Sequence, residues 1–134
     1  MLVHGKCHCG QIVYEAEIDP ARVVICHCND CQALTGSAYR VSVPANPNTF
    51  KLLSGTPKVY IKIAESGNRR AHSFCGNCGS PMYVTAEHDT QNYTLRIGNM
   101  AERKSLKPSR QIWCESANPN YTNLNDVPKV QKQS

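Results

Sequence analysis

The sequence lacks the features that mark membrane and secreted proteins. No apolar run in its 134 residues approaches the roughly 20 residues needed to span a bilayer. Met1-Leu2-Val3 is followed at once by His4 and Lys6, where a signal peptide would have its apolar core. We therefore expect a cytoplasmic protein without a membrane partner, long enough for one domain with its own core.

A block of positive charge is also missing. The 15 Lys and Arg residues are dispersed, the densest pairs being Arg69-Arg70 and Arg103-Lys104, and no aromatic residues are interleaved with them. If four cysteines bind one zinc and three bind another, the thiolates and ions together remove three of the five formal charges and leave +2. We expect these pairs to lie on solvated faces and predict no nucleic-acid partner.

Strong amphipathic helices are absent as well, and short strand-like segments take their place. Residues 117–134 are rich in Asn, Pro and Lys, which predicts a domain over residues 1–116 and a partly ordered tail over 117–134. Alternating and β-branched residues predict short strands over residues 11–18, 22–25, 37–43, 49–53, 58–63, 71–74, 81–85, 93–97 and 111–114.

Cysteine is the residue that the sequence has in excess. Without a secretory signal, eight cysteines favour metal binding over disulfides, because cytosolic thiols are kept reduced. Only Cys114 stands alone, and the other seven form three groups: Cys7-His8-Cys9, Cys26-His27-Cys28 with Cys31, and Cys75-Gly76-Asn77-Cys78.

The central group, Cys26, Cys28 and Cys31, holds three thiols within six residues. In an extended segment Cys26 and Cys28 point to the same side and His27 to the other. Three cysteines are one ligand short of a closed tetrahedral zinc site, and an open fourth position is what distinguishes a reactive zinc from a structural one.

A short helix should follow the first two cysteines of this group. Asn29 is a good N-cap, with Gln32 as its reciprocal capping partner, and Gly36 suits the C-terminal end. Cys31 would then lie in the first turn, where unpaired backbone N–H groups favour a thiolate.

The Cys75-to-Cys78 segment, followed by Gly79, has the form of a zinc knuckle. Its missing half is best supplied by Cys7 and Cys9, which completes a structural four-sulfur site. Spacing leaves open a second assignment, in which the knuckle joins part of the central group.

The histidines between cysteines are weaker ligand candidates. If both flanking sulfurs bind one ion, His8 and His27 point away from it, and they are expected to pack or to form hydrogen bonds. Cys114 is expected to be a small buried apolar residue, although it is the one unassigned thiol available to close the central site.

Three motifs in order carry a family resemblance: Gly5-Lys6-Cys7-His8-Cys9-Gly10, Cys26-His27-Cys28-Asn29-Asp30-Cys31 followed by Gly36, and Phe74-Cys75-Gly76-Asn77-Cys78-Gly79-Ser80. Together they resemble the glutathione-dependent formaldehyde-activating enzyme family, which also includes centromere protein V. The resemblance implies a mainly β, Mss4-like fold of several small coiled antiparallel sheets with one short helix. It also implies two zinc ions per chain, a structural one on Cys7, Cys9, Cys75 and Cys78 and a labile one on Cys26, Cys28 and Cys31.

The resemblance further implies a carbon–sulfur lyase-type activity, the addition of glutathione to formaldehyde or its reverse. Cys26, Cys28 and Cys31 would carry catalysis, with the substrate thiolate at the open zinc position or with the ion polarising the carbonyl. Arg40 and Arg69 are candidates for binding the carboxylates of glutathione. Other thiol adducts are possible substrates, and the alternative functions are a zinc-binding scaffold and a thiol-responsive zinc-binding protein.

Overall fold

The computed structural model describes residues 1–89 and 91–133, and within them the chain is mainly β, as predicted. One α-helix, α1 (Asn29–Thr35), is accompanied by five 3-10 helices: η1 (Pro20–Arg22), η2 (Ile97–Asn99), η3 (Arg103–Ser105), η4 (Cys114–Ser116) and η5 (Pro119–Tyr121). The strands are β1 (Leu2–Lys6), β2 (Val13–Glu17), β3 (Val24–Cys26), β4 (Arg40–Pro44), β5 (Lys51–Ser54), β6 (Lys58–Ile63), β7 (Arg69–Phe74), β8 (Pro81–Ala86), β9 (Thr94–Arg96) and β10 (Arg110–Ile112).

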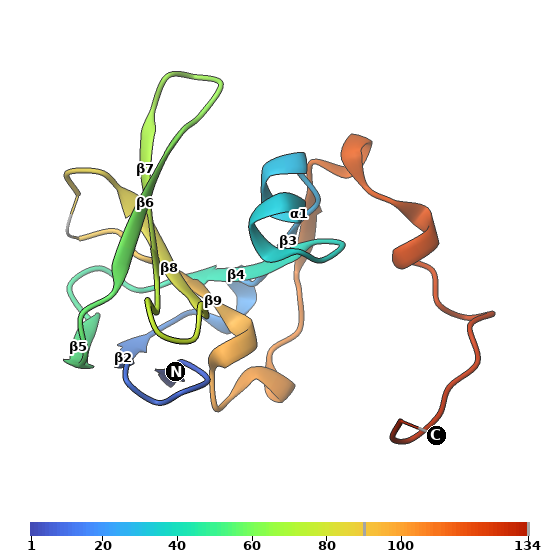
Figure 1. The fold of residues 1–134 in the computed structure, drawn as a ribbon, viewed down its shortest axis with the longest axis horizontal. Helices are drawn as coiled ribbons and strands as arrows, with labels where there is room; N and C mark the ends of the chain where they lie inside the picture. The colour runs from blue at the N-terminus through green and yellow to red at the C-terminus, as the bar shows by residue number, and fades with distance from the viewer. Residues whose placement is uncertain (90, 134) are drawn as a thin grey trace.

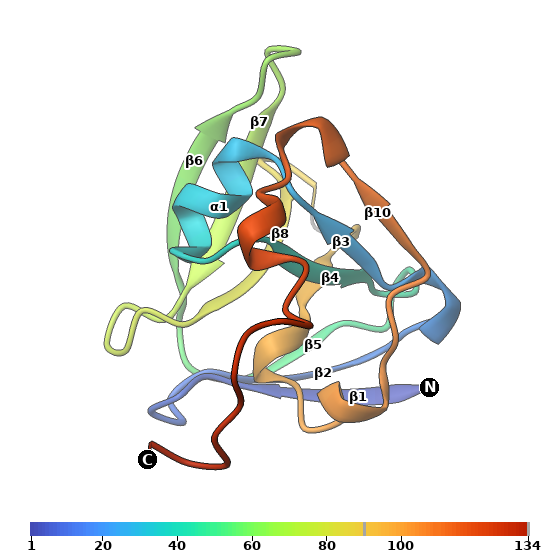
Figure 2. The ribbon, with the colours of Figure 1, turned by 90° about the vertical axis from the view of Figure 1, so that its right-hand side faces the viewer.

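The strands form two sheets. A three-stranded sheet has the order β1-β2-β5, and a seven-stranded sheet has the order β10-β3-β4-β9-β8-β7-β6. In Figure 2, β1 and β2 cross the lower part of the molecule and the larger sheet lies above them. The β10–β3 pair is parallel, with Gln111 beside Ile25, whereas the other neighbours are antiparallel. A parallel pair needs a long connection, which the chain between β3 and β10 provides.

Strand β1 was not predicted, although it carries a period-2 pattern in which Val3 and Gly5 are buried. It pairs with β2 so that Gly5 lies opposite Tyr14. A Cβ atom on Gly5 would stand 2.1 Å from the ring of Tyr14, so only glycine lets the tyrosine ring lie across the strand. The glycine that weakens the strand signal is therefore what allows β1 to pack.

The hydrophobic core lies between the two sheets. The smaller sheet contributes Val3, Tyr14 and Ala16, and the larger sheet contributes side chains that include Val43 and Leu95. Both inner faces lose water on folding, which supplies the main driving force for a domain of this size. This packing places the turns that follow β1 and β7 close to each other.

The chain after β10 leaves this core. In Figure 1 the segment past η4 runs away from the sheets, and residues 121–133 are exposed throughout. Among the described residues, no helix combines the length and apolar character needed to cross a membrane.

Candidate metal centres and the hollows beside them

The first cysteine cluster joins two turns that lie far apart in the sequence. Cys7 and Cys9 follow β1, and Cys75 and Cys78 follow β7, and their four sulfurs lie within 4.8 Å of one another. The structure thus groups the knuckle with the N-terminal pair and not with the central cysteines. The predicted pairing of Cys75 and Cys78 with Cys7 and Cys9 is therefore confirmed.

Backbone N–H groups in both turns point at sulfur. Ile12 donates to Cys7 Sγ at 3.2 Å, and Cys78 donates to Cys75 Sγ at 3.5 Å. Gly79 has φ +78°, as expected for the glycine of a knuckle. Each turn therefore directs a backbone donor at one of its sulfurs, and a donor in this position stabilises negative charge on sulfur.

The spacing of the sulfurs and the lowered pKa values of Cys9 and Cys78 fit a metal in this cluster. The Cys7–Cys9 and Cys9–Cys75 sulfur pairs are each 3.6 Å apart, and a tetrahedral zinc with Zn–S bonds of about 2.3 Å separates its sulfurs by roughly 3.8 Å. Hydrogen bonding from Ser80 is the main cause that lowers the pKa of Cys78 to about 5, and a hydrogen bond from Asn77 leads those that lower the pKa of Cys9.

The second cluster consists of Cys26, Cys28 and Cys31, whose sulfurs also lie within 4.8 Å of one another. Cys26 ends β3, Cys28 has an extended backbone with φ −62° and ψ 153°, and Cys31 lies in the first turn of α1. Strand alternation followed by one helical turn aligns the three sulfurs, as predicted. No further Cys, His, Asp or Glu from residues 1–89 and 91–133 joins this group.

The helix that carries Cys31 is capped differently from the prediction. Cys28 is the N-cap, and its sulfur accepts the Cys31 N–H at 3.2 Å, so the expectation that Asn29 is the cap was wrong. Gln32 does not reach back to the cap, and its amide donates to the carbonyls of His27 and Ser116. The Cys28 sulfur thus takes the place of the usual side-chain oxygen as the cap acceptor. The Gln32 amide instead links α1 to the η4 segment through the Ser116 carbonyl.

Burial and hydrogen bonding act in opposite directions on the pKa values of these three thiols. Burial raises the pKa of Cys26, and it raises the pKa of Cys31 to about 12, with the charge of Arg40 opposing it. Burial also acts to raise the pKa of Cys28, but hydrogen bonds led by the Cys31 N–H outweigh it and lower the pKa. Three thiolates this close repel one another, and a divalent cation would neutralise most of their charge. The donor set therefore fits zinc.

The histidines are not ligands in this arrangement. His27 is buried, with its Nε2 atom 2.7 Å from Gln111 Oε1 and its ring edge-on to Tyr39, and His8 is exposed. These contacts match the packing and hydrogen-bonding roles expected from alternation. Cys114 lies in η4 and belongs to neither cluster. It is exposed, so the prediction that it is a buried apolar residue was wrong.

Two hollows lie beside the clusters. The larger, of about 890 Å³, falls within the size range of small-molecule sites. It reaches from Cys7 and Ser80 at the first cluster to Thr35 at the end of α1. The smaller, of about 380 Å³, includes Leu34 of the same helix. No cysteine of the second cluster lines either hollow, so α1 is the element that connects the cluster to both.

Two arginines, Arg40 and Arg96, are shared by the two hollows. Arg40 and Arg96 line both of them and are almost fully buried. Arg69, the other nominated arginine, is exposed, forms an ion pair with Glu87 and lines neither hollow. The sequence prediction missed Arg96, because a single basic residue in a short strand is usually solvated and only its position between the apolar Leu95 and Ile97 could have indicated burial.

Comparisons with known proteins found a similar fold and a matching family. A solved crystal structure of a Rhodobacter sphaeroides protein, a structural-genomics target, superimposes with a TM-score of 0.61 at 19% sequence identity and covers 83% of this chain and 99% of its own. That likeness concerns the fold alone. No curated protein matched the sequence. The model of the glutathione-dependent formaldehyde-activating enzyme family matches residues 2–116, and the chain therefore belongs to that family.

Proposed function

We propose that this chain is a zinc-dependent carbon–sulfur lyase-type enzyme that acts on adducts of formaldehyde, or of a related aldehyde, with glutathione or another thiol. Membership of the family supports a reaction of glutathione and formaldehyde. The observation that carries the proposal is the incomplete ligand set of the second cluster. Its three sulfurs gather as a metal site does, and no fourth side chain in the described part of the chain completes it.

The two clusters would have different tasks. Cys7, Cys9, Cys75 and Cys78 would hold a structural zinc, because four sulfurs complete a tetrahedron. Cys26, Cys28 and Cys31 would hold the second. An ion bound there supplies a Lewis-acidic position that keeps a substrate thiol deprotonated or polarises the aldehyde oxygen.

The residues around the second cluster hold it in shape. The Cys31 N–H donates to Cys28 Sγ, and the Thr35 hydroxyl donates to the Cys31 carbonyl at 2.7 Å. Lys62 lies 2.8 Å from Asp30, which ties the first turn of α1 to β6. These contacts fix Cys31 relative to Cys26 and Cys28, and no side chain from residues 1–89 and 91–133 supplies a fourth ligand to the three sulfurs.

The proposed reaction involves no oxidation or reduction. In the forward direction the thiol gives up its proton, its sulfur forms a bond to the carbonyl carbon, and the carbonyl oxygen takes a proton to become a hydroxyl. In the reverse direction the carbon–sulfur bond breaks and the hydroxyl proton is lost as the carbonyl re-forms. A free thiol is only a few per cent ionised at pH 7, so stabilising its anion is the main task of the site.

Substitution Cys31→Ser tests the assignment. We expect the variant to lose turnover above the uncatalysed rate while its far-UV circular dichroism stays that of the wild type. Cys114→Ser is the matched control, because Cys114 is exposed and outside both clusters, and it should keep full activity. A Cys31→Ser variant with full activity would rule out the second cluster as the catalytic site.

Zinc content gives a second test that does not depend on the identity of the substrate. Elemental analysis before and after dialysis against excess glutathione should show two zinc ions per chain falling to one. Loss of one ion would indicate an open site that thiols reach. If both ions stay, the second cluster is closed and the scaffold function takes the place of the enzyme.

The remaining expectations stay proposals. We propose that residues 1–116 form the zinc-binding domain and residues 117–134 a tail, because residues 121–133 are exposed throughout. We also propose that the protein works in the cytoplasm, where reduced thiols and glutathione are abundant.

A further inference from the structure

Two buried arginines have no acidic partner among the described residues. Arg40 is 5% exposed and Arg96 is 9% exposed, and neither takes part in any of the ion pairs found there. Arg96 donates to Ser42 Oγ at 2.9 Å and lies 3.4 Å from His72 Nδ1. The Nε of Arg40 is buried and has no hydrogen-bond partner. Burying charges without counter-charges is costly, so these residues are expected to serve a ligand.

Strand pairing puts both guanidinium groups on the same face. Ser42 of β4 lies directly opposite Arg96 of β9, and Arg40 is two residues before Ser42 on the same strand. Side chains two apart along a strand share a face. Both arginines line the larger and the smaller hollow, so they stand together where the two hollows meet.

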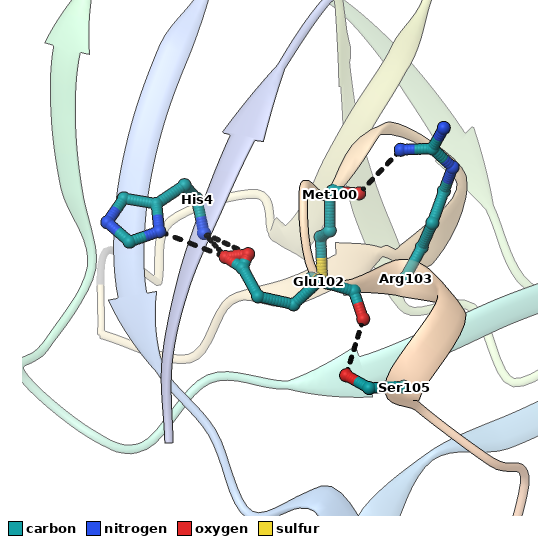
Figure 3. Close-up of polar contacts among 5 residues, drawn as sticks. All are labelled: His4, Met100, Glu102, Arg103 and Ser105. Atoms are coloured by element: carbon teal, nitrogen blue, oxygen red, sulfur yellow. Dashed lines mark hydrogen bonds and ion pairs between the residues drawn. The ribbon is translucent and has the colours of Figure 1, made fainter.

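The surroundings are positive. The lining of the larger hollow contains Lys6, Arg103 and two histidines in addition to the two arginines, and no Asp or Glu of the described residues. The nearby Glu102 is engaged by His4, whose Nδ1 lies 2.9 Å from its carboxylate, and Arg103 donates to the Met100 carbonyl (Figure 3). Arg40 and Arg96 are therefore the buried charged residues that line the larger hollow.

The second cluster offsets part of this charge. Three thiolates and one zinc ion would carry −1, whereas the two arginines carry +2, which leaves one positive charge unbalanced. An anionic ligand would supply the missing charge.

We propose that Arg40 and Arg96 bind the carboxylate of a thiol ligand, or of its aldehyde adduct, where the two hollows meet. This rests on the proposed function only in taking the ligand to be a thiol or its adduct. Thr35 and Leu34, from the last turn of α1, line the larger and smaller hollows respectively, so a ligand at the arginines also lies against the end of the helix that carries Cys31. The planar guanidinium of arginine can donate two parallel hydrogen bonds to a carboxylate. A thiol without a carboxylate would gain nothing from these two arginines.

Isothermal titration calorimetry with S-methylglutathione tests the site separately from catalysis. This probe keeps the carboxylates of glutathione but has no free thiol, so its binding does not require a sulfur at the second cluster. We expect zinc-loaded wild type to bind it at least tenfold more tightly than its diethyl ester, in which both carboxylates are blocked. Arg40→Gln should weaken binding of the probe by tenfold to a hundredfold, the loss that one charge-assisted hydrogen bond produces.

Arg69→Gln is the matched protein control, because Arg69 is exposed and lines neither hollow, and it should bind the probe like the wild type. Arg96→Gln is a second variant that should show the same loss if Arg40→Gln fails to fold. Zinc content should stay at the wild-type value in both. Equal binding by wild type and both arginine variants, or equal binding of the probe and its diester, would overturn the proposal.

Inorganic phosphate distinguishes the ligand chemistry. If the site takes carboxylates, phosphate should displace the probe only at higher concentration than S-methylglutathione itself requires. Displacement at lower concentration would assign the arginine pair to phosphate and overturn the carboxylate assignment. Because the probe lacks a thiol, these results stand whether or not Cys31→Ser abolishes turnover.

Discussion

Loss of the first metal cluster should destabilise the fold by an amount that the topology sets. The cluster closes a loop between Cys9 and Cys75, which are 66 residues apart. In the chain-entropy model of a cross-link, a loop of this size is worth about 4 kcal/mol at 25 °C. The whole domain is expected to be stable by only about 5 to 15 kcal/mol, so the cluster would supply a large share.

Substitution Cys7→Ser tests this figure. Cys7 is a buried member of the cluster, and serine removes the thiolate while changing little in volume. After dialysis against a weak chelator, the variant should hold one zinc fewer than the wild type. Its free energy of unfolding in urea should fall by about 4 kcal/mol, and its melting temperature by roughly 15 °C for a chain of this length.

Two comparisons separate the metal from the side chain. The metal-free forms of wild type and Cys7→Ser should unfold at similar urea concentrations, because neither has the cross-link. Cys114→Ser, which changes an exposed thiol outside both clusters, should stay within about 0.5 kcal/mol of the wild type. A zinc-loaded Cys7→Ser protein as stable as the wild type would refute the reasoning.

Two further predictions concern packing and pH. Gly5→Ala places a Cβ atom 2.1 Å from the ring of Tyr14 and should lower the free energy of unfolding by about 1 to 3 kcal/mol. Gly98→Ala meets nothing within 4 Å and should change it little; equal urea midpoints for the two variants would contradict the β1–β2 packing. Burial and the charge of Arg96 lower the pKa of His72 from 6.5 to about 4, so the unfolded chain takes up this proton at a higher pH than the folded one. Acid therefore destabilises the fold between pH 6.5 and 4. The urea midpoint of wild type should fall faster in this range than that of His72→Gln, and parallel pH profiles would be the contrary result.

Local spacing was enough to identify the cysteine groups. A Cys-x-Cys pair on extended chain and a Cys-x-x-Cys pair in a turn orient their sulfurs through the backbone of a few neighbouring residues. Cys26, Cys28 and Cys31 gather for that reason, and Gly36, with φ +61°, ends the helix as its position predicts. The mainly β class followed from alternation and from the absence of helical periodicity.

Other features depend on neighbours that are distant in the sequence. The sequence indicated an N-cap near Asn29, but the sulfur of Cys28 took that role because the chain turns into the cluster there. Strand β1 was missed because Gly5 weakens its signal, and its role becomes visible only when Tyr14 is seen to occupy the space of the missing side chain.

By itself the sequence determined which thiols of each motif point the same way, because the geometry of each motif is set by bonds within three or four residues. Only the tertiary structure decided that the turn after β1 meets the turn after β7, since sheet packing brings those turns together. It also decided that Arg40 and Arg96 are buried on one face of strands β4 and β9, which pair only in the folded sheet. Arginines that look solvated in the sequence become buried when the pairing of these strands removes them from water.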